Sequence, residues 1–590
     1  MRKKGVHRVM NFRNILSVFV ILVLLLSSAI TVSADYPFFY QRYAADPTGL
    51  EYNGRLYLYG SHDVYQEGKG YIINDITCIS TDDLKNWTDH GEVFKATTDS
   101  SWGATLAWAP SVVYRNNKFY MYYGNGGGNI GVAVSDSPTG PFKDTRSGPL
   151  VSGSTPGVNP PNGFWCFDPC AFIDDDGQAY LYFGGNGEGN TRVIKLNSDM
   201  VSVNGAASQI VAPRFFEASY MHKYNGKYYF SYSTNFSQGA ATINYMMSNS
   251  PTTGFVDKGM ILPNPPSNES NNNHQSIFSF KGNWYIAYHN RYLAAQNGFT
   301  GEARVYQRNM CMDRLYYNAD GTIQQVTITT NSLPQLKYVN PYVTNEAETM
   351  AQEYGINTEA CSEGGRNVSY IENGDWIRVK GVDFGSGASS FDARVASATS
   401  GGNIEIRLDS PTGTLVGTCA VPGTGGWQTW TTKSCNVSGA TGVHDLYLKF
   451  TGGSGYLFNM NWWKFNSSSG TATRVECENM TKSGPYAGNI TSPFSGVALY
   501  ANGDYCANDF NFPGAKNYTI SVRGASNNSS TAKVAVYIGG VKKGTLSFAG
   551  TTPSVQSLSV SLSAGSQQVK LQMDDDVGAW DTYVDYYEIN

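Results

Sequence analysis

Short runs of alternating apolar and polar residues recur along the first half of the chain, each arranged around a small turn. Five such turns lie at residues 54, 117, 177, 226 and 282. Alternating aromatic and apolar residues follow each turn, as in Leu56 to Tyr59 and Phe119 to Tyr122. Period-two alternation on both sides of a Gly- or Asn-containing turn is typical of a β-hairpin. The turns are 63, 60, 49 and 56 residues apart, and this spacing predicts a five-bladed β-propeller over residues 35–337.

One residue stands eight or nine positions before each turn. These lead residues are Asp46, Ala109, Asp168, Glu217 and His274. Because they share one phase of the repeat, we expect each at the entry of the innermost strand of its blade, facing a common channel. Three carboxylates and a histidine brought together cost free energy unless some are protonated or bridged. Asp-Pro alone is a common turn opener, so the shared phase carries this prediction. Asp174, Asp175 and Asp176 instead lie in a turn and are expected to form a solvated loop.

The first 34 residues have the pattern of a secretory signal. Five basic residues precede the apolar run from Ile15 to Leu26, and Val32-Ser33-Ala34 is a small-residue cleavage site. The run is short for a membrane anchor. We therefore expect a secreted, extracellular protein that begins at Asp35.

Composition narrows the range of partners. The formal net charge is −5, and the signal would remove basic residues only. This balance argues against nucleic acid and anionic membranes as partners. With 40 Tyr, 64 Gly and 11 Trp, the chain suits a secreted β-protein that binds an uncharged polymer, and we expect a monomer. The nine cysteines can oxidise outside the cell, but the sequence leaves their pairing open.

Two further segments follow the repeats and resemble each other in outline. Residues 341–466 begin near Glu346-Ala-Glu348, and residues 474–590 begin near Glu476-Cys-Glu478. Each has the length and the short alternating strands of one β-sandwich of the jelly-roll type. Residues 467–473 have the sequence SSSGTAT and are predicted to form a flexible linker. The predicted fold class is therefore all-β, with a five-bladed propeller followed by two β-sandwiches.

The converging acids Asp46, Asp168 and Glu217 indicate acid–base chemistry. Hydrolysis of a glycosidic bond needs one protonated carboxyl and one ionised carboxylate. A third carboxylate nearby would raise the pKa of the acid by repulsion. The residues alone therefore suggest a glycosidase.

The propeller segment resembles glycoside hydrolase family 43, the five-bladed hydrolases of plant cell-wall polysaccharide. The resemblance rests on Ala45-Asp46-Pro47, Trp108-Ala109-Pro110-Ser111, Phe167-Asp168-Pro169, Phe216-Glu217-Ala218 and Asn273-His274-Gln275. It implies an inverting mechanism, with Asp46 as general base, Glu217 as general acid, and Asp168 tuning the pKa of Glu217 and orienting it. Inversion requires the base and acid carboxyls to stand roughly 6.5–9.5 Å apart.

Three other residues of the propeller are candidates for contact with the substrate. His274 either fills the channel as a buried histidine or helps to hold a central cation or water, and a structural role is favoured. Trp108 and Trp165 are candidates for the pocket wall, because sugar faces stack on aromatic rings. Either tryptophan can equally belong to the core.

Residues 341–466 resemble carbohydrate-binding module family 6. The resemblance rests on the Glu346–Glu348 start, Tyr370 to Trp376, Gly426-Trp427-Gln428 and Phe458-Asn459. It implies that Tyr370 and Trp427 clamp a sugar ring and that Asn459 hydrogen-bonds it. It also implies a structural Ca²⁺ held by Glu346 and Glu348, with Asn461 where the family often has Asp.

Residues 474–590 resemble carbohydrate-binding module family 36, a xylan-binding sandwich that uses calcium to reach its ligand. The resemblance rests on Gly484 to Asn489, Ala498 to Asn502 and Trp580 to Tyr586. It implies a ligand-bridging Ca²⁺ flanked by Tyr486 and Tyr500, and a second, structural Ca²⁺. The ligands implied for the first ion are Asp576, Asp581 and the carbonyl of Trp580, and those for the second are Glu476, Glu478 and Asp585.

Together these features predict a secreted hydrolase of xylan or arabinoxylan that needs no cofactor for its chemistry. The activity we favour is release of α-L-arabinofuranosyl side chains. β-Xylosidase and endo-1,4-β-xylanase activity are alternatives on the same carboxylates. A non-catalytic polysaccharide-binding protein is an alternative of another class.

Overall fold

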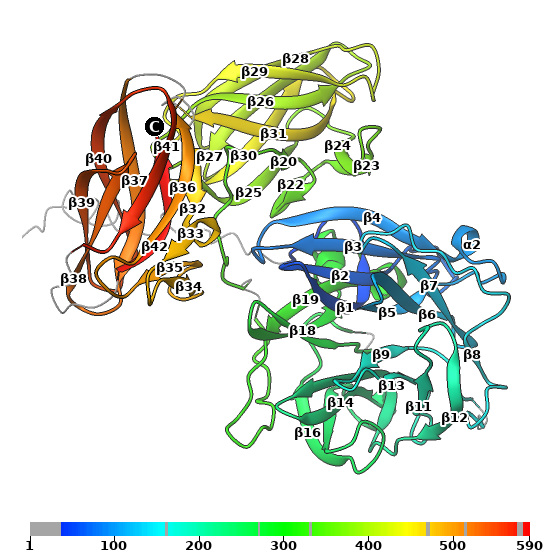
Figure 1. The fold of residues 1–590 in the computed structure, drawn as a ribbon. Coiled ribbons are helices and arrows are strands. Elements are labelled where there is room, and N and C mark those ends of the chain that lie inside the picture. Colours follow the sequence, from blue (N-terminus) through cyan, green and yellow to red (C-terminus); the bar gives the residue numbers. More distant parts are fainter. Residues whose placement is uncertain are drawn as a thin grey trace, which may run out of the picture. The chain divides into compact units, whose positions relative to one another are not determined.

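The computed structural model describes residues 37–159, 163–269, 272–329, 333–467, 473–512, 516–574 and 582–590. The predicted signal at residues 1–34 lies outside these ranges. The chain divides into two compact units, one made of residues 1–337, 348–370 and 377–380 and the other of residues 338–347, 371–376 and 381–590. Figure 1 labels the strands of the propeller and of the two sandwiches.

Five antiparallel sheets form the propeller. Their first strands, β1, β5, β9, β13 and β17, contact one another in a closed ring around the central channel. The first sheet contains β1 (Ala44–Tyr52), β2 (Arg55–His62), β3 (Asp75–Thr81), β4 (Trp87–Lys95) and the short β21 (Thr349–Met350). The second contains β5 (Trp108–Arg115), β6 (Lys118–Asn125), β7 (Asn129–Ser135) and β8 (Val151–Ser152). The third contains β9 (Cys170–Ile173), β10 (Ala179–Phe183), β11 (Arg192–Leu196) and β12 (Val203–Gln209). The fourth contains β13 (Phe215–Tyr224), β14 (Lys227–Thr234), β15 (Ile243–Ser248) and β16 (Val256–Leu262). The fifth contains β17 (Ser276–Phe280), β18 (Asn283–Asn290) and β19 (Asn309–Arg314).

Four of the five inner hairpins close through two-residue turns with positive φ at both central positions. These pairs are Asn53-Gly54, Asn116-Asn117, Asn225-Gly226 and Lys281-Gly282. Such turns match the twist of the flanking strands and favour Asn and Gly. The repeat could therefore be predicted from Asn and Gly in the turns together with the alternation of apolar and polar residues in the strands.

The third turn is longer, and one prediction made for it is wrong. Asp174 is buried, where its carboxylate accepts hydrogen bonds from Lys223 Nζ and the Tyr228 hydroxyl, both at 2.6 Å. Asp175 and Asp176 are exposed, as expected of a solvated loop. A run of three identical acids does not reveal which one meets a neighbouring blade.

Apolar clusters fill the space between adjacent blades. Tyr122 and Ile130 of the second blade pack in one cluster with Leu181 and Phe183 of the third. Such face-to-face packing of blades explains why β6, β10 and β14, the second strands of their blades, are buried almost throughout.

The first sandwich consists of two antiparallel sheets. One contains β20 (Asn345–Glu346), β23 (Asn357–Ala360), β24 (Arg366–Ser369), β31 (Asn459–Ser467), β26 (Ala388–Ala396) and β29 (Thr431–Asn436). The other contains β22 (Gln352–Tyr354), β25 (Trp376–Asp383), β30 (Val443–Gly452), β27 (Gly401–Leu408) and β28 (Thr414–Pro422).

The second sandwich has the same plan. One sheet contains β32 (Thr473–Glu476), β34 (Gly488–Ile490), β35 (Gly496–Leu499), β42 (Thr582–Ile589), β37 (Lys516–Ser526) and β40 (Ser554–Leu562). The other contains β33 (Thr481–Ser483), β36 (Tyr505–Phe512), β41 (Gly565–Gln572), β38 (Thr531–Ile538) and β39 (Val541–Ala549). Val522, Val536, Phe548 and Leu571 lie in the core between its two sheets.

Helices in the described residues are single turns. They are α2 (Ala96–Asp99), η1 (Phe236–Gln238), α3 (Tyr292–Gln296), α4 (Gly301–Val305) and η2 (Cys477–Asn479). In this part of the chain, none has the length and apolar character needed to cross a membrane. The predicted all-β architecture of a propeller followed by two sandwiches is confirmed.

Candidate active site

The backbone at the lead positions has a shared conformation that aims their side chains. Asp46, Ala109 and Asp168 have φ values of 50°, 45° and 48°, and a proline follows each of them. Register irregularities interrupt β1 between Ala45 and Thr48 and β5 between Trp108 and Ser111. Bulges of this kind re-aim side chains next to functional sites. In the fourth blade the positive φ falls on Ala218, directly after Glu217. The register of β13 shifts on both sides of Glu217.

Asp46 is buried beside Arg308, His289 and His274. Arg308 Nη1 donates to Asp46 Oδ1 at 2.8 Å, and the Asp46 amide donates to His289 Nδ1 at 3.3 Å. Burial opposes ionisation of Asp46, but Arg308, followed by His289 and His274, outweighs it and holds the pKa of Asp46 well below its usual range. Asp46 is therefore an ionised carboxylate at neutral pH.

Asp168 and Glu217 are close enough to titrate as a pair. The Ala218 amide donates to Asp168 Oδ2 at 3.0 Å, which fixes this carboxyl beside Glu217. Burial raises the pKa of Asp168, and repulsion from Glu217 and Asp46 adds to the effect. Burial likewise raises the pKa of Glu217 to about 8, with a further contribution from Asp46 against the opposing charge of Arg308. At neutral pH this pair therefore retains a proton, while Asp46 has none.

His274 lies between the acids. Its Nδ1 is 3.7 Å from both Asp46 Oδ1 and Asp168 Oδ2. Burial lowers the pKa of His274 to about 4, although Asp46 acts in the opposite direction. The imidazole is therefore neutral at neutral pH and spaces the carboxyls without forming an ion pair.

Besides His289, two residues near the site were not predicted from the sequence. Arg308 is buried, and its guanidinium binds Asp63 through Nη2 at 2.7 Å and Nε at 2.8 Å as well as binding Asp46. It also lies over the Tyr71 ring, 4.7 Å from the centroid. Arg308 and Asp63 fall outside the repeated phase, so periodicity gave no signal for them.

The two candidate tryptophans differ in their surroundings. Trp165 is 38% exposed and lies edge-on to Phe216, the residue before Glu217, at 6.0 Å. Trp108 is half-buried beside Tyr71 at 6.5 Å. Among the described residues its buried Nε1 has no hydrogen-bond partner. Trp165 therefore offers a ring surface, whereas Trp108 offers a hydrogen-bond donor.

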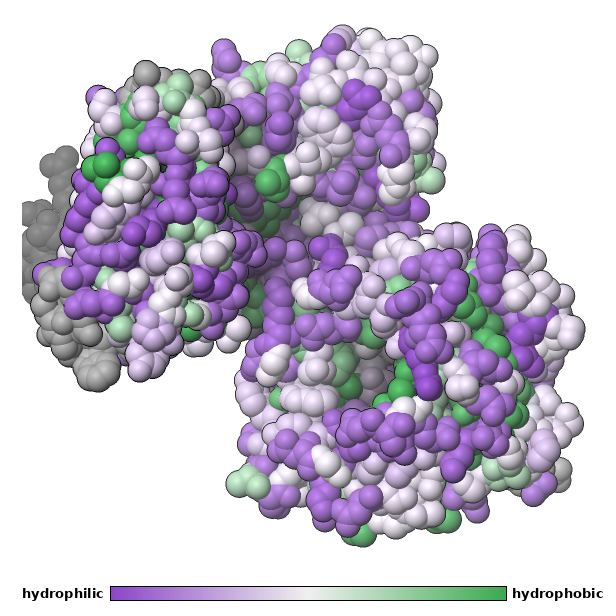
Figure 2. All heavy atoms as spheres, in the orientation of Figure 1, coloured by the Kyte–Doolittle hydropathy of each residue, from purple (hydrophilic) through white to green (hydrophobic). Residues whose placement is uncertain are grey.

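Figure 2 shows a hollow near the centre of the propeller face turned to the viewer, bordered by both apolar and polar residues. A pocket at one end of the channel is lined by Trp284 and by residues of β1, β5, β9, β13 and β17 that lie beyond the lead residue of each strand. The acids therefore lie towards the opposite end of the channel.

In the first sandwich the predicted aromatic pair is exposed. Tyr370 is 49% exposed and Trp427 is 36% exposed. The Ser397 carbonyl accepts from the amides of Thr424, Gly425 and Gly426, and so anchors the Trp427 loop. Asn459 is buried, and its Nδ2 donates to the Trp427 carbonyl at 2.9 Å. In this structure Asn459 therefore positions the loop.

In the second sandwich a buried aspartate organises the aromatic pair. Tyr486 is 63% exposed and Tyr500 is 36% exposed. The Asp504 carboxylate accepts from the amides of Tyr486 at 3.5 Å and of Tyr500 and Ala501 at 3.2 Å. The sequence analysis missed Asp504. The predicted ligands Asp576, Trp580 and Asp581 lie outside the described residues.

The predicted structural metal ligands are only loosely gathered. Glu346 pairs with Trp462, next to Asn461, across β20 and β31, and Glu348 is buried. In the second sandwich, Glu476 pairs with Arg474 at 2.8 Å and Asp585 forms an ion pair with Arg523. The buried Glu478 Oε2 has no hydrogen-bond partner in the described part of the chain. Burial raises the pKa of Glu478, and Glu476 and Asp585 add to it, so the three acids are neighbours.

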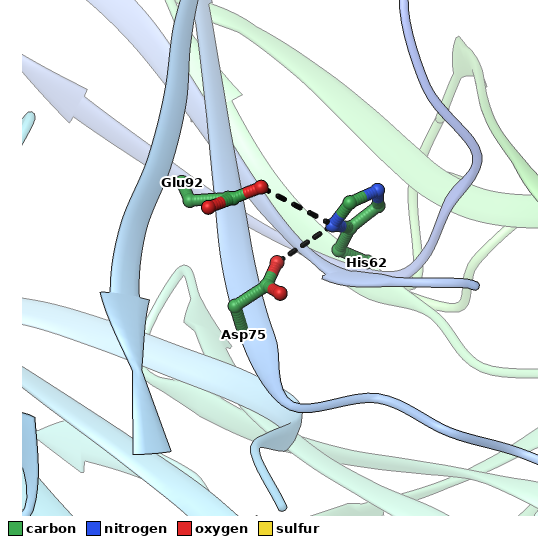
Figure 3. A group of neighbouring side chains, drawn as sticks. All are labelled: His62, Asp75 and Glu92. Atoms are coloured by element: carbon green, nitrogen blue, oxygen red, sulfur yellow. Dashed lines mark hydrogen bonds and ion pairs between the residues drawn. The ribbon is translucent and has the colours of Figure 1, made fainter. Parts of the chain in front are cut away.

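A different group is tighter. His62, Asp75 and Glu92 face one another across β2, β3 and β4 (Figure 3), with their ligand atoms within 4.8 Å. His62 Nδ1 lies 2.7 Å from Asp75 Oδ1 and 3.9 Å from Glu92 Oε1. The His62–Asp75 hydrogen bond accounts for this geometry without an ion.

Sequence profiles match the whole length of this architecture. The profile of Glycosyl hydrolases family 43 matches residues 35–323. An arabinoxylan arabinofuranohydrolase of Paenibacillus polymyxa is 43% identical to this chain over 603 residues, covering 94% of each sequence. The chain belongs to glycosyl hydrolase family 43. It is therefore a glycosidase, as the converging acids predicted.

Two further comparisons extend the family 43 assignment. An arabinoxylan arabinofuranohydrolase of Bacillus subtilis (strain 168) is 42% identical and covers 71% of this chain and 90% of its own. The crystal structure of a family 43 arabinoxylan arabinofuranohydrolase from Bacillus subtilis, in complex with cellotetraose, has a TM-score of 0.68 and 42% identity. It covers 73% of this chain and 97% of that one.

Both sandwiches of this family 43 chain match one profile, Carbohydrate binding module (family 6), at residues 346–467 and 476–590. The first match agrees with the predicted family 6 module. The second match covers the segment for which family 36 was predicted. Both segments are therefore carbohydrate-binding modules, and the profile assigns the second one to family 6.

Proposed function

We propose that this family 43 enzyme releases α-L-arabinofuranosyl side chains from arabinoxylan with inversion at the anomeric carbon. The observation that carries the proposal is the placing of two acids in one channel in different surroundings. Asp46 accepts from the Arg308 guanidinium, which lowers its pKa, whereas burial raises the pKa of Glu217. The names of the relatives above support arabinoxylan as the substrate. β-Xylosidase and endo-1,4-β-xylanase activity stay alternatives on the same acids.

In the proposed mechanism Asp46 removes a proton from water, which attacks the anomeric carbon. Glu217 gives its proton to the leaving oxygen of the xylan chain. Asp168 is fixed beside Glu217 by the Ala218 amide, and its negative charge disfavours loss of the proton from Glu217. Trp165 supplies a stacking surface, and Trp108 Nε1 supplies a donor for a sugar hydroxyl. Arg308 donates to Asp46 and Asp63, and its charge holds the pKa of the base Asp46 well below its usual range. Burial and the charge of Asp46 keep the pKa of Glu217 raised against the same arginine.

The sugar that is released tests the substrate assignment. We expect digestion of wheat arabinoxylan to yield free L-arabinose, with the xylan backbone left at its original length. Proton NMR during the first minutes should show the anomer of inverted configuration. Release of xylose or of short xylo-oligosaccharides as the main product would instead favour one of the two alternatives.

The pH profile tests the roles of the acids. Activity requires Glu217 protonated, so kcat/KM should fall as the pH rises through about 8. Asp46, with its lowered pKa, should stay ionised down to acidic pH and leave a broad plateau below that limb. In Asp168→Asn the alkaline limb should move to lower pH, because one negative charge beside Glu217 is gone. An unmoved limb would contradict the pairing of Asp168 with Glu217.

We further propose that the second module binds a structural Ca²⁺ through Glu476, Glu478 and Asp585. All the ligand atoms in this set are oxygens, which Ca²⁺ prefers, and among the described residues the buried Glu478 Oε2 has no hydrogen-bond partner. Adding Ca²⁺ to chelator-treated protein is expected to raise the melting temperature, and Glu478→Gln should remove this increase. The matched control is Asp509→Asn on β36, an exposed acid outside the group. Equal increases in both variants would exclude Glu478 as a ligand.

The remaining predictions follow from the sequence. The Ca²⁺ site at Glu346, Glu348 and Asn461, the ligand-bridging Ca²⁺ in the second module, secretion and a monomeric state remain proposals. Binding to xylan through Tyr370, Trp427, Tyr486 and Tyr500 would raise the local substrate concentration.

A further inference from the structure

Each sandwich module places two cysteines near each other. Cys419 lies on β28 and Cys435 on β29, the edge strands of opposite sheets. The Ser438 amide donates to the Val416 carbonyl at 3.0 Å, and the two strands lie against each other. Continued antiparallel from that bond, the register sets Cys419 opposite Cys435. The two thiols lie close enough for each to act on the pKa of the other.

The second pair lies in the core of the other module. Cys477 on η2 and Cys506 on β36 are both fully buried and belong to one apolar cluster. The two side chains lie close enough for Cys506 to act on the Cys477 thiol. By contrast, the propeller thiols Cys78 and Cys170 donate to the carbonyls of Ile79 and Ala171. The nearness of a second thiol therefore distinguishes the module pairs from these propeller thiols.

Both pairs bracket the exposed aromatic residues of their modules. Residues 419–435 include the loop that presents Trp427, and residues 477–506 include Tyr486 and Tyr500. A covalent link at the base of each segment would restrict the loop before a sugar arrives. Restricting a loop in its bound conformation lowers the entropic cost of binding.

We propose that Cys419–Cys435 and Cys477–Cys506 form disulfides that close the two segments presenting these aromatic residues. The link between the disulfides and sugar binding rests on the proposed function of the modules, whereas the disulfides themselves do not. The oxidant is a small-molecule disulfide such as oxidised glutathione. One thiolate attacks it and releases one glutathione thiol, and the second cysteine then displaces the other glutathione from the mixed disulfide. Two protein thiols and one glutathione disulfide thus become one protein disulfide and two glutathione thiols.

The two pairs should oxidise by different routes. Cys435 is partly exposed, and the nearby Cys419 thiol lowers its pKa, so it is the attacking thiolate in the folded protein. Cys477 and Cys506 are both fully buried, so that pair reacts only while its core is open. The first disulfide should therefore form in folded protein, and the second during refolding.

Peptide mapping of the full chain tests the assignment. Protein is incubated with oxidised glutathione, either folded or during refolding, then alkylated with iodoacetamide and digested without reduction. We expect cross-linked peptides joining Cys419 to Cys435 in both samples and Cys477 to Cys506 after refolding, with Cys78 alkylated on denaturation. Alkylated module cysteines after refolding, or links to other partners, would overturn the disulfides. Equally fast linkage of both pairs in folded protein would overturn Cys435 as the attacking thiolate.

Variants separate the links from the function. Cys419→Ser should leave a stable glutathione adduct on Cys435, while Cys78→Ser should leave both links intact. Reduction of the wild-type protein should lower the melting temperature of the modules by roughly 10 °C. It should also weaken retention on insoluble xylan several-fold. Mapped disulfides with unchanged xylan retention would refute only their effect on sugar binding, and absent retention in both redox states would refute the module function instead.

Discussion

The Glu217→Gln enzyme is expected to release arabinose from arabinoxylan about 10²–10⁴-fold more slowly than the wild type, the usual contribution of a general acid. The glutamine amide has nearly the same shape as the carboxyl but cannot give a proton to the leaving xylan oxygen. Because substrate contacts are otherwise kept, the loss should fall on kcat with little change in KM. Steady-state rates from arabinose released at pH 6 measure both constants.

The choice of leaving group sharpens this test. On 4-nitrophenyl α-L-arabinofuranoside, whose leaving phenolate needs little protonation, Glu217→Gln should lose far less activity than on the polymer. The matched control is Asp176→Asn, an exposed carboxylate in the turn between β9 and β10, which should act like the wild type on both substrates. Unchanged arabinose release by Glu217→Gln on arabinoxylan would leave a non-catalytic binding protein as the better account.

The fold could be predicted because local chemistry repeats. Asn-Gly and Asn-Asn turns between strands of alternating aromatic residues predict the hairpin of the first two strands of a blade. This prediction does not depend on the other strands of the blade. The outer strands are less regular, and β8, with two residues, leaves almost no pattern. Asp174 shows the limit of local reasoning, because its partners Lys223 and Tyr228 come from the next blade.

The site could be predicted only where it follows the repeat. Asp46, Asp168 and His274 share one phase, and the structure sets both acids 3.7 Å from the same imidazole. Arg308, Asp63 and His289 act on Asp46 from outside that phase. Their roles depend on the closure of the last blade on the first, a long-range contact that no local pattern encodes.

Arg308→Met is expected to lower the free energy of unfolding by about 3–5 kcal/mol, because it leaves two buried carboxylates without their cation. Asp46 loses the strongest influence that keeps it ionised, so its pKa should rise. The acid limb of kcat/KM should then move to higher pH, and the alkaline limb should move up as well, because Arg308 also lowers the pKa of Glu217. Urea unfolding and a pH profile measure the two effects separately. Arg407→Met, which breaks a partly exposed pair with Glu405 in the first sandwich, should cost less than about 1 kcal/mol.

The double variant Arg308→Met/Asp63→Asn separates stability from catalysis. Removing the charge of Asp63 takes away one of the two stranded carboxylates, so part of the lost stability should return. Asp46 still lacks its cation, so the acid limb should stay displaced. Because Asp63 touches Arg308 and Arg308 touches Asp46, an acid limb that returned with stability would mean that Arg308 supports the blades without setting the charge of the base.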